Sequence, residues 1–444
     1  MKPHSVTVAA FLVAATTAML GVPGVAFAAR PLEPVQHVYP DSTLEEIQQA
    51  IDNGGTVLFD RLTKQTRQYG EYNQVASSTP DLPPTTTNPA KGFNIGKNGK
   101  DVNIVGVLGP NGERPKINGG TAVFRVGAFP GFGFLGLPVS FKIENLELSN
   151  PDMTAASGLY SRIGVWVMNA LGAQSRINNC KFTITGKESD PGHMNNHSVA
   201  IWFYLAANQP PPSGARIDVT NNTIIGTRIH EGLHVDSFWP DTPGFTPPRA
   251  FVGNNTVIAT NLRGFANKGG TNGATVNTAI FVGGNLANSI VANNIVRGYG
   301  RSPGLTPRQE NIAIGLQTAG TAEMDSANIT VVGNDSSSFT GDFQLWMETI
   351  ISESTVARNS FGPASAAGVM CRGRDNRFDE NRFYGDYPGW DRSANGPGLF
   401  WFTKTSRGNL VTSTRLNAHG SDICGQLFDE TAGDNTIPGF ENCR

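Results

Sequence analysis

The sequence carries little charge and no long block of one sign. Its 444 residues include 34 Lys plus Arg against 36 Asp plus Glu. A nucleic-acid-binding protein needs a basic excess to neutralise phosphates, so this class is excluded. Cysteine is also scarce, since Cys180, Cys371, Cys424 and Cys443 are the only four and no C-x-x-C pair occurs. That is too few for a disulfide scaffold. We expect Cys180 to be a buried filler, and a bridge between Cys424 and Cys443 would stabilise the C-terminal tail.

Long apolar runs are absent after the first 28 residues. Lys2 and His4 form a weakly basic start, residues 6–21 are apolar, and Ala26-Phe27-Ala28 is a small-x-small cleavage site. This pattern is typical of a secretory signal peptide cleaved near Ala28, and the run is too short and wrongly flanked for a membrane span. We therefore expect a secreted protein, extracellular or periplasmic, with no membrane span.

Glycine, by contrast, is abundant at 52 residues and suits many tight turns between short strands. A helix is predicted from residue 42 or 43, capped by Ser42 or Thr43 with Glu45 or Glu46 as capping-box partner, and ending at residues 53–55. A strand over 56–59 follows. Such a helix would cover the open first edge of a solenoid. The predicted organisation is a signal peptide (1–28), an N-terminal cap region and loop (29–101), and a repeat domain with its C-terminal tail (102–444).

Short strands marked by Asn recur from residue 102 onward. Successive markers Asn293, Asn334, Asn359 and Asn381 are 41, 25 and 22 residues apart. The shorter intervals match one turn of a parallel β-solenoid, and the longer ones leave room for loop insertions. Asn tolerates the left-handed backbone of a sharp corner, and stacked Asn amides can bond from one turn, or rung, to the next.

These features resemble the pectate-lyase-like superfamily of right-handed parallel β-helix proteins over roughly residues 102–437. The resemblance implies an all-β, single-stranded right-handed parallel β-helix with an N-terminal capping helix and long loop insertions. It is a resemblance of fold. The motifs of polygalacturonases, classical pectate lyases and alginate epimerases are missing, so no catalytic residue is carried over from those families.

A second repeated pattern lies in eight segments, at 164–169, 200–205, 232–237, 264–269, 311–316, 342–347, 368–373 and 398–403. Their third and fifth residues should point out of the solenoid and stack about 4.8 Å apart. The third residues are Trp166, Trp202, His234, Ala266, Ala313, Gln344, Met370 and Phe400, and the fifth are Met168, Tyr204, Asp236, Lys268, Gly315, Trp346, Arg372 and Phe402. Aromatic rings around a polar centre favour a groove for a polysaccharide. The alternative is that long insertions cover these aromatics as a satellite core.

Three kinds of chemistry could use this polar centre. His230 to His234 match H-E-x-x-H, but this zinc-protease motif requires a helix and the text here alternates as a strand. A metal held by His230, His234 and Asp236 in another geometry stays open. Glycoside hydrolysis needs two carboxyl groups about 5–10 Å apart, whereas Asp236 and Glu348 would lie roughly 14 Å apart. Glu231 or Asp241 could approach Asp236 instead.

Lyase chemistry on a uronic-acid polymer fits the predicted column best. It needs a base, a cationic clamp for the carboxylate and an acid for the leaving oxygen. We predict Lys268 or His234 as base, Arg263 as clamp, and Asp236 orienting the base or holding a cation; a plain Asp236–Lys268 salt bridge is the alternative. Ca²⁺ is suggested by analogy alone. Predicted substrate-binding residues are Trp166, Trp202, Tyr204, His230, Arg301, Gln344, Trp346, Glu348 and Arg372.

The sequence therefore predicts a secreted, carbohydrate-active β-helix protein, expected to be a monomer that acts on a polysaccharide. A polysaccharide lyase is the first hypothesis. A glycoside hydrolase of the same fold is the second, and a non-catalytic carbohydrate-binding or adhesin solenoid is the third, because it could use the same aromatic groove without the His, Asp and Lys centre.

Overall fold

The computed structural model describes most of the chain from residue 34 to residue 437. The described residues are 34–74, 92–119, 122–129, 134–150, 162–168, 171–185, 198–205, 212–227, 229–237, 243–260, 275–299, 309–317, 326–349, 351–385, 398–416, 427–429, 431 and 434–437. The predicted signal peptide, and with it the prediction of export, lies outside these residues.

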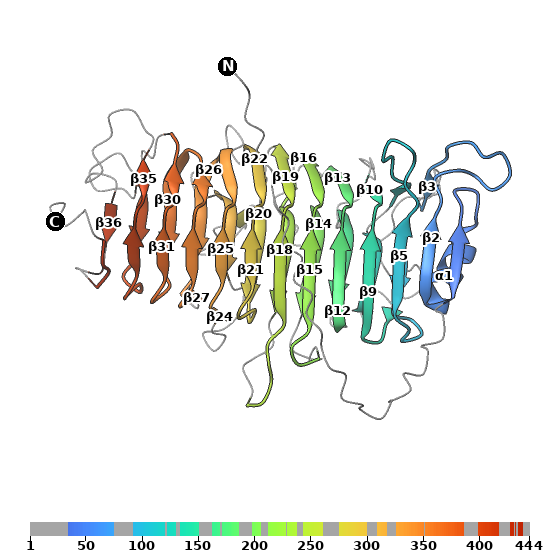
Figure 1. Cartoon of the computed structure of the whole chain (residues 1–444), viewed down its shortest axis with the longest axis horizontal. Helices are drawn as coiled ribbons and strands as arrows, with labels where there is room; N and C mark the ends of the chain where they lie inside the picture. Colours follow the sequence, from blue (N-terminus) through green and yellow to red (C-terminus); the bar gives the residue numbers. More distant parts are fainter. Residues whose placement is uncertain are drawn as a thin grey trace, which may run out of the picture. The chain divides into compact units, whose positions relative to one another are not determined.

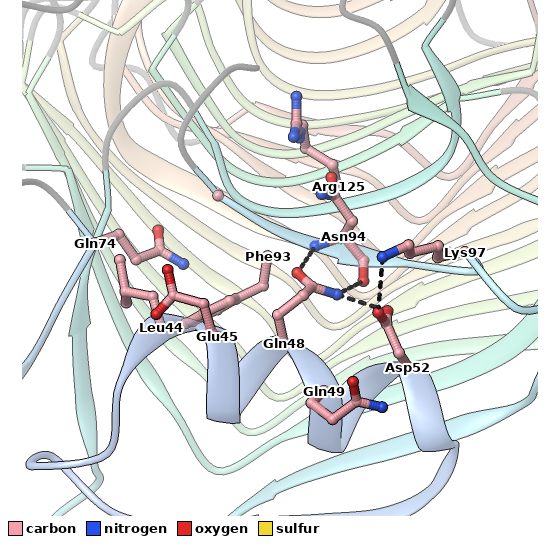
Figure 2. A pocket seen from close by; sticks show the side chains of 11 residues that line it. Leu44, Glu45, Gln48, Gln49, Asp52, Gln74, Phe93, Asn94, Lys97 and Arg125 are labelled. Atoms are coloured by element: carbon pink, nitrogen blue, oxygen red, sulfur yellow. Dashed lines mark hydrogen bonds and ion pairs between the residues drawn. The ribbon is translucent and has the colours of Figure 1, made fainter. Parts of the chain in front are cut away.

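The single described helix, α1 (Leu44–Asn53), forms where the sequence predicts it. Thr43 is the N-cap, and its hydroxyl and the Glu46 carboxylate accept each other's backbone N–H groups as a capping box. Ile47, Ala50 and Ile51 are buried, and the helix ends at Gly54, whose φ of 72° favours glycine. On the outer side, Gln48 bonds to the backbone of Asn94 (Figure 2).

The strands stack in parallel on three faces, in the order of the chain from α1 to β36 (Figure 1). The first face is a 12-stranded sheet. Its strands are β1 (Val35–Val38), β2 (Gly55–Phe59), β5 (Val102–Gly106), β9 (Val139–Glu144), β12 (Leu171–Asn178), β15 (Arg216–Thr220), β18 (Arg249–Gly253), β21 (Ile290–Ala292), β25 (Thr330–Val332), β28 (Thr355–Ala357), β31 (Arg377–Asp379) and β34 (Leu410–Thr412). β2 pairs with β5 across the domain boundary expected at residue 102.

The second and third faces are joined through β26 (Asp335–Met347), which runs along both. The second face contains β3 (Tyr72–Asn73), β6 (Lys116–Asn118), β10 (Glu147–Asn150), β13 (Lys181–Thr185), β16 (Thr223–Thr227), β19 (Thr256–Thr260), β22 (Ile295–Tyr299), β26, β29 (Ser360–Phe361), β32 (Arg382–Phe383) and β35 (Arg415–Leu416). The third contains β4 (Phe93–Ile95), β7 (Ala122–Phe129), β11 (Arg162–Met168), β14 (Ser198–Leu205), β17 (Glu231–Ser237), β20 (Thr275–Gly284), β23 (Gln309–Gln317), β26, β30 (Ala364–Cys371), β33 (Phe400–Phe402) and β36 (Leu427–Asp429).

Three short strands complete the set. β8 (Phe134–Leu135) pairs antiparallel with β7, and β24 (Ser326–Ala327) pairs with β27 (Ile351–Ser352). Inward Val, Ile, Leu and Phe side chains from all three faces form one continuous core. The predicted parallel β-helix is confirmed. No helix within the described ranges is long and apolar enough to cross a membrane.

Asparagines at the corner between the first and second faces have two separate roles: one set turns the chain, and the other forms hydrogen bonds between rungs. Asn221, Asn254 and Asn293 adopt positive φ values of 57°, 56° and 55°, which turn the chain sharply. The Asn that follows each of them is buried. The amide oxygen of Asn222 accepts the Cys180 backbone N–H, and from Asn255 onward each amide oxygen accepts two N–H groups from the Asn of the previous rung. This ladder comprises Asn222, Asn255, Asn294, Asn334, Asn359 and Asn381. The predicted Asn stacking is confirmed, although Asn293 belongs to the turning set.

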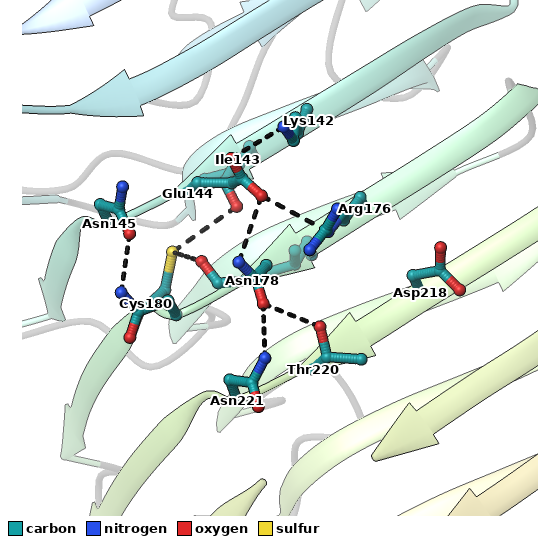
Figure 3. Close-up of polar contacts among 12 residues, drawn as sticks. Lys142, Ile143, Glu144, Asn145, Arg176, Asn178, Cys180, Asp218, Thr220 and Asn221 are labelled. Carbon is teal, nitrogen blue, oxygen red and sulfur yellow. Dashed lines mark hydrogen bonds and ion pairs between the residues drawn. The ribbon is translucent and has the colours of Figure 1, made fainter. Parts of the chain in front are cut away.

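Polar side chains on the outside of the first face also link neighbouring rungs (Figure 3). The Glu144 carboxylate lies 2.9 Å from Lys142 Nζ and 3.4 Å from Arg176 Nε, and Asn178 Oδ1 accepts a 2.8 Å bond from Asn221 Nδ2. Cys180 and Cys371 are buried free thiols whose pKa values burial raises to about 12. The predicted burial of Cys180 is confirmed, while Cys424 and Cys443 lie outside the described residues.

Candidate functional site

Outward side chains of the third face stack in one continuous column, here called the outer column. Strand pairing places its members side by side in the order Asn94, Arg125, Trp166, Trp202, His234, Phe281, Gly315, Trp346, Met370 and Trp401. The residues on either side of each, such as Leu233 and Val235 around His234 or Ile280 and Val282 around Phe281, belong to the inner core.

The predicted alignment is correct for three rungs and wrong at the fourth. Trp202 pairs with Trp166 and His234, and Tyr204 pairs with Asp236, as expected. The next rung, however, is β20, which places Phe281 beside His234 and Gly283 beside Asp236. Residues 264–269 show the same apolar alternation by chance, so Ala266 and Lys268 were assigned a position that β20 occupies. Lys268 and Arg263 themselves lie outside the described residues.

In the C-terminal half the predicted alignment is displaced. Gly315 pairs with Trp346, so Ala313 and Gln344 precede the outer column by two residues. Gln344 is buried, and its amide donates to the carbonyls of Phe339 and Pro363 at 2.9 and 2.7 Å. In β33, Phe400 and Phe402 point into the core, which leaves Trp401 outside. Because β33 consists of three consecutive aromatic residues, the sequence contains no polar residue there that would indicate which side chains face inward.

Most of the outer aromatics are covered. Trp166 and Trp346 are each only 4% exposed and pack in two apolar clusters separate from the core. Trp202, Tyr204 and Trp401 are half-buried, and the Trp166 and Trp202 rings stack at 5.3 Å between centroids. The satellite-core alternative therefore applies to Trp166 and Trp346, while partly exposed aromatic surface remains beside His234.

Between these two clusters, β17 carries an acid–histidine–acid cluster formed by Glu231, His234 and Asp236. His234 Nδ1 lies 2.6 Å from Glu231 Oε2, and His234 Nε2 lies 2.8 Å from Asp236 Oδ2. The three residues are 5%, 9% and 1% exposed. The Nε2–Oδ2 separation is that of an ion pair, but the atoms are not aligned as a hydrogen bond. The Asp236 carboxylate therefore keeps unused hydrogen-bonding capacity within the described residues.

Glu231 reaches this cluster through a local irregularity of the strand. Its rung partners, Val199 and Thr278, lie beside the outer column, and the pairing skips Gly232. A Cβ on Gly232 would lie 2.6 Å from the Ala279 carbonyl oxygen and 2.7 Å from the Val257 side chain, so no other residue fits without displacement. If the strand alternated strictly, Glu231 would lie on the inward face. The sequence therefore predicts that Glu231 could approach Asp236 only from a loop.

The ring of His234 is held between aromatic neighbours. It stacks on Phe281 at 4.2 Å between centroids and meets Trp202 edge-on at 5.8 Å. Burial by itself lowers the pKa of His234, but the nearby charges of Glu231 and Asp236 outweigh it and raise the pKa to about 10. Burial raises the pKa of Asp236, and the His234 charge only partly offsets this.

At neutral pH the cluster thus holds an imidazolium between two carboxyl groups. An imidazolium donates a proton and cannot accept one, so His234 does not serve as the predicted base in this state. The two carboxyl groups lie on opposite edges of one ring, so the imidazole fills the space between them. They therefore do not flank a glycosidic bond in the way that the carboxyl pair of an inverting glycosidase does.

Other predicted binding residues form a separate group farther along the outer column. Glu348 accepts a 2.8 Å bond from Trp346 Nε1 and lies 3.3 Å from an Arg372 guanidinium nitrogen. That guanidinium lies 5.3 Å from the Trp346 ring centroid, a cation–π distance. His230 is half-buried, and its backbone N–H donates to the Ser198 carbonyl. Arg301 lies outside the described residues.

The H-E-x-x-H text does not form a zinc-protease site, because residues 231–237 are a strand and not a helix. Both ring nitrogens of His234 face carboxylates, so neither is available as a metal ligand. Within the described ranges no group of three or more His, Cys, Asp and Glu side chains is arranged to hold a metal ion.

The strand pairing and the buried charged cluster define a parallel β-helix protein with a candidate site on its third face. No protein-family model matches the chain, and no curated protein matches it. Among solved structures, tailspike protein 3 of bacteriophage CBA120 is 15% identical with a TM-score of 0.35, over 90% of this chain and 61% of its own. The chain thus spans less than two thirds of that tailspike.

Two further solved structures are similar at the same distance. GH136 lacto-N-biosidase from Eubacterium ramulus is 12% identical with a TM-score of 0.44, over 91% of this chain and 67% of its own. PfbA, a surface adhesin of Streptococcus pneumoniae, is 12% identical with a TM-score of 0.37, over 85% of this chain and 90% of its own. At this distance the similarities carry no functional argument, and membership of the pectate-lyase-like superfamily stays a prediction.

Proposed function

We propose that this protein is a secreted, carbohydrate-active enzyme that hydrolyses a polysaccharide at the Glu231–His234–Asp236 cluster. The observation that carries the proposal is the buried His234 ring held between two carboxyl groups, one rung from half-buried aromatic side chains. Buried, mutually perturbed titratable groups are costly for a fold and are concentrated at functional sites.

The neighbouring rungs favour a sugar as substrate. Trp202 and Tyr204 lie one rung from His234 and Asp236 and are half-buried, so each presents part of an aromatic ring beside the cluster. Aromatic faces stack on sugar rings, and the unused capacity of Asp236 to accept hydrogen bonds suits a hydroxyl group. The aromatic and polar groups together supply both stacking and orientation.

In the proposed reaction, the imidazolium of His234 would transfer its proton to the glycosidic oxygen as the bond to the anomeric carbon breaks. The Asp236 carboxylate would take a proton from the water that attacks that carbon, and would then return this proton to His234 across their 2.8 Å contact. Glu231 holds His234 in its protonated form.

β-Elimination on a uronic-acid polymer is the second candidate, because an imidazolium between two carboxyl groups is a proton donor for a leaving oxygen. It requires a base from outside the cluster, and Lys268 with Arg263 as clamp remains the prediction for that role. The two reactions differ in product. Elimination leaves an unsaturated uronate that absorbs near 235 nm, whereas hydrolysis releases reducing ends without that absorbance.

The test incubates the mature chain with a panel of neutral and uronate polysaccharides and follows both signals. Glu231→Gln and Asp236→Asn should each lower the cleavage rate about 10²- to 10⁴-fold. Asp218→Asn is the matched control, since Asp218 is also buried and ion-paired but lies on β15, on the first face of the same turn. Unchanged cleavage in both cluster variants would refute the assignment.

The non-catalytic alternative has its own outcome. If no polymer yields reducing ends or absorbance near 235 nm, but one is retained by the immobilised protein and released by Trp202→Ala, the protein is a carbohydrate-binding solenoid. Trp202 is chosen because its ring is partly exposed and stacks on Trp166 without taking part in the acid–histidine–acid contacts.

A further inference from the structure

A cavity of about 290 Å³, here called the hollow, lies on the outside of the first face, where β15, β18 and β21 lie side by side (Figure 1). It is lined by Arg216, Arg249, Ala250, Phe251, Asn288 and Ile290. Since β15, β16 and β17 form one turn of the solenoid, the acid–histidine–acid cluster lies on a different face of the same turn. The hollow is therefore separate from the cluster, and its volume is at the lower end of the range for small-molecule sites.

Two arginines of the hollow belong to neighbouring rungs, and only one of them is neutralised. Arg216 pairs in register with Arg249, so their Cα atoms lie about 4.8 Å apart. Arg216 Nε lies 2.8 Å from Oδ1 of Asp218, a residue outside the lining. Arg249 has no such carboxylate partner among the residues that the structure describes. Like charges on adjacent strands repel each other, so this pair favours the binding of an anion.

The hollow also exposes apolar surface that the fold does not use. Phe251 and Ile290 pair in register and lie outside the inner core. Ile290 is 39% exposed, and Phe251 is half-buried. At the same position, the neighbouring rungs of the first face carry the polar residues Arg176, Asp218, Thr330, Thr355 and Arg377. Contiguous exposed apolar surface marks interaction sites, whereas isolated apolar side chains do not.

The position of the Phe251 ring separates the apolar part of the hollow from the cationic part. The tip of the ring lies over Gly253, where a Cβ would be only 2.6 Å from the Cζ atom of Phe251. The ring therefore extends along the strand away from Arg249, which lies two residues earlier in the chain. Glycine is required at residue 253, because any side chain there would displace the ring. The hollow thus has a cationic end and an apolar end.

We infer that the hollow binds a small aromatic carboxylate, with its carboxylate on Arg249 and its ring against Phe251 and Ile290. A guanidinium group can bind a carboxylate through two parallel hydrogen bonds. Pairs of aromatic rings are favourable beyond the area that they bury. An inorganic anion would leave the apolar end unused, and an uncharged ring would leave Arg249 without a partner. This inference goes beyond the proposed function and does not rest on it.

The experiment measures binding of benzoate to the mature chain by titration with saturation-transfer NMR. Acetate has the carboxylate without the ring, and benzyl alcohol has the ring without the charge, so each should bind more weakly by roughly tenfold or more. Arg249→Gln should weaken benzoate binding about 10- to 100-fold, because it removes the charged hydrogen-bond donor. Ile290→Glu should abolish binding by placing a carboxylate at the apolar end. Both positions are exposed, so we expect both variants to fold.

Matched variants make the same changes elsewhere on the first face. Arg377→Gln and Thr355→Glu, on the neighbouring strands β31 and β28, should leave benzoate binding unchanged. Glu231→Gln should also leave it unchanged, which tests this site whether or not any polymer is cleaved. Benzoate binding that only the two hollow variants weaken supports the proposal.

Three results would overturn the aromatic carboxylate site. The first is absence of benzoate binding. The second is binding of acetate, benzyl alcohol or inorganic phosphate as tight as that of benzoate, because the hollow would then not select for both a charge and a ring. The third is benzoate binding that neither Arg249→Gln nor Ile290→Glu alters.

Discussion

The charge state of His234 should be visible in the pH dependence of stability. Its pKa is about 10 in the folded protein, against 6.5 for the unperturbed side chain. The folded chain therefore holds a proton through this window that the unfolded chain has lost. Stability is fully present below pH 6.5 and falls as the pH rises toward 10, by about 1.4 kcal/mol per pH unit and roughly 5 kcal/mol in total.

The titration of other buried groups sets the upper pH limit of this stability measurement. The buried thiols of Cys180 and Cys371, with pKa values raised to about 12, also lose stability as the pH rises, but only above the ordinary thiol value of 9.0. Asp236, whose pKa is raised above 3.8, acts in the same direction from lower pH. Between pH 6.5 and 8.5 the fall assigned to His234 is about 2 kcal/mol, because the unfolded side chain is only half deprotonated at pH 6.5.

Glu231→Gln removes one of the two charges that hold this proton. The pKa of His234 should move down toward its ordinary value, and the pH-dependent fall should shrink. At pH 6 the variant should be less stable than the wild type by about 2–3 kcal/mol, the contribution of a hydrogen bond to a charged group. Asp218→Asn, which breaks an ion pair on the first face, should keep the wild-type pH dependence.

The assay is urea unfolding at pH 6.5, 7.5 and 8.5 for the three proteins, with ¹⁵N chemical shifts of the His234 ring as a direct titration. A wild-type stability that stays constant over this window would refute the reasoning. So would ring shifts that titrate near pH 6.5, because they would show that the two carboxylates do not hold the imidazolium.

Three further predictions concern the scaffold. Asn294→Ala leaves several buried partners of the Asn ladder unsatisfied and should lower the free energy of unfolding in urea by about 2–5 kcal/mol. Asn293→Gly replaces a residue whose φ is 55° and should change the free energy of unfolding by less than about 0.5 kcal/mol. Equal effects of the two substitutions would contradict the separate roles of the two asparagines. Gly232→Ala should cost about 1–3 kcal/mol by overpacking and lower cleavage by displacing Glu231, and full activity would argue against the strand irregularity. Thr43→Ala should cost about 1 kcal/mol and speed amide exchange in α1 only, and unchanged exchange there would contradict the capping box.

The fold was predictable because its signals are local and repeated. The capping box is confirmed, and so are both physical roles assigned to corner asparagines. The sequence did not show that adjacent residues share these roles, with Asn254 turning the chain and Asn255 bonding to the next rung. A single marker residue per rung therefore mixes two columns, which is why Asn293 was grouped with ladder members.

The sequence predicts the alignment of the outer column correctly only where the insertions between its strands are short. Trp166, Trp202 and His234 lie on consecutive rungs and were aligned correctly. After Ser237 the chain passes through two strands of the other faces before it returns at β20, and the insertion contains text with the same alternation. Periodicity cannot distinguish such text from a true rung, since only hydrogen bonding between rungs fixes the register.

Glu231 escaped the sequence prediction for a reason that also explains its role. In five successive rungs a small residue stands two positions before the outer column, as Gly164, Ala200, Gly232, Ala279 and Ala313. The residue before it then lies beside the outer column, and in these rungs it is Ile163, Val199, Glu231, Thr278 or Ile312.

Glu231 is the one acid of that set, in a position where three neighbours are aliphatic and fully buried. An aliphatic residue would satisfy the fold there, because replacing buried ion pairs by apolar side chains is often neutral or stabilising. The carboxylate is therefore explained by its contact with His234 and not by packing. The sequence signal for this cluster is a small residue at the same position in successive rungs, preceded in one rung by an acid and followed two residues later by a histidine.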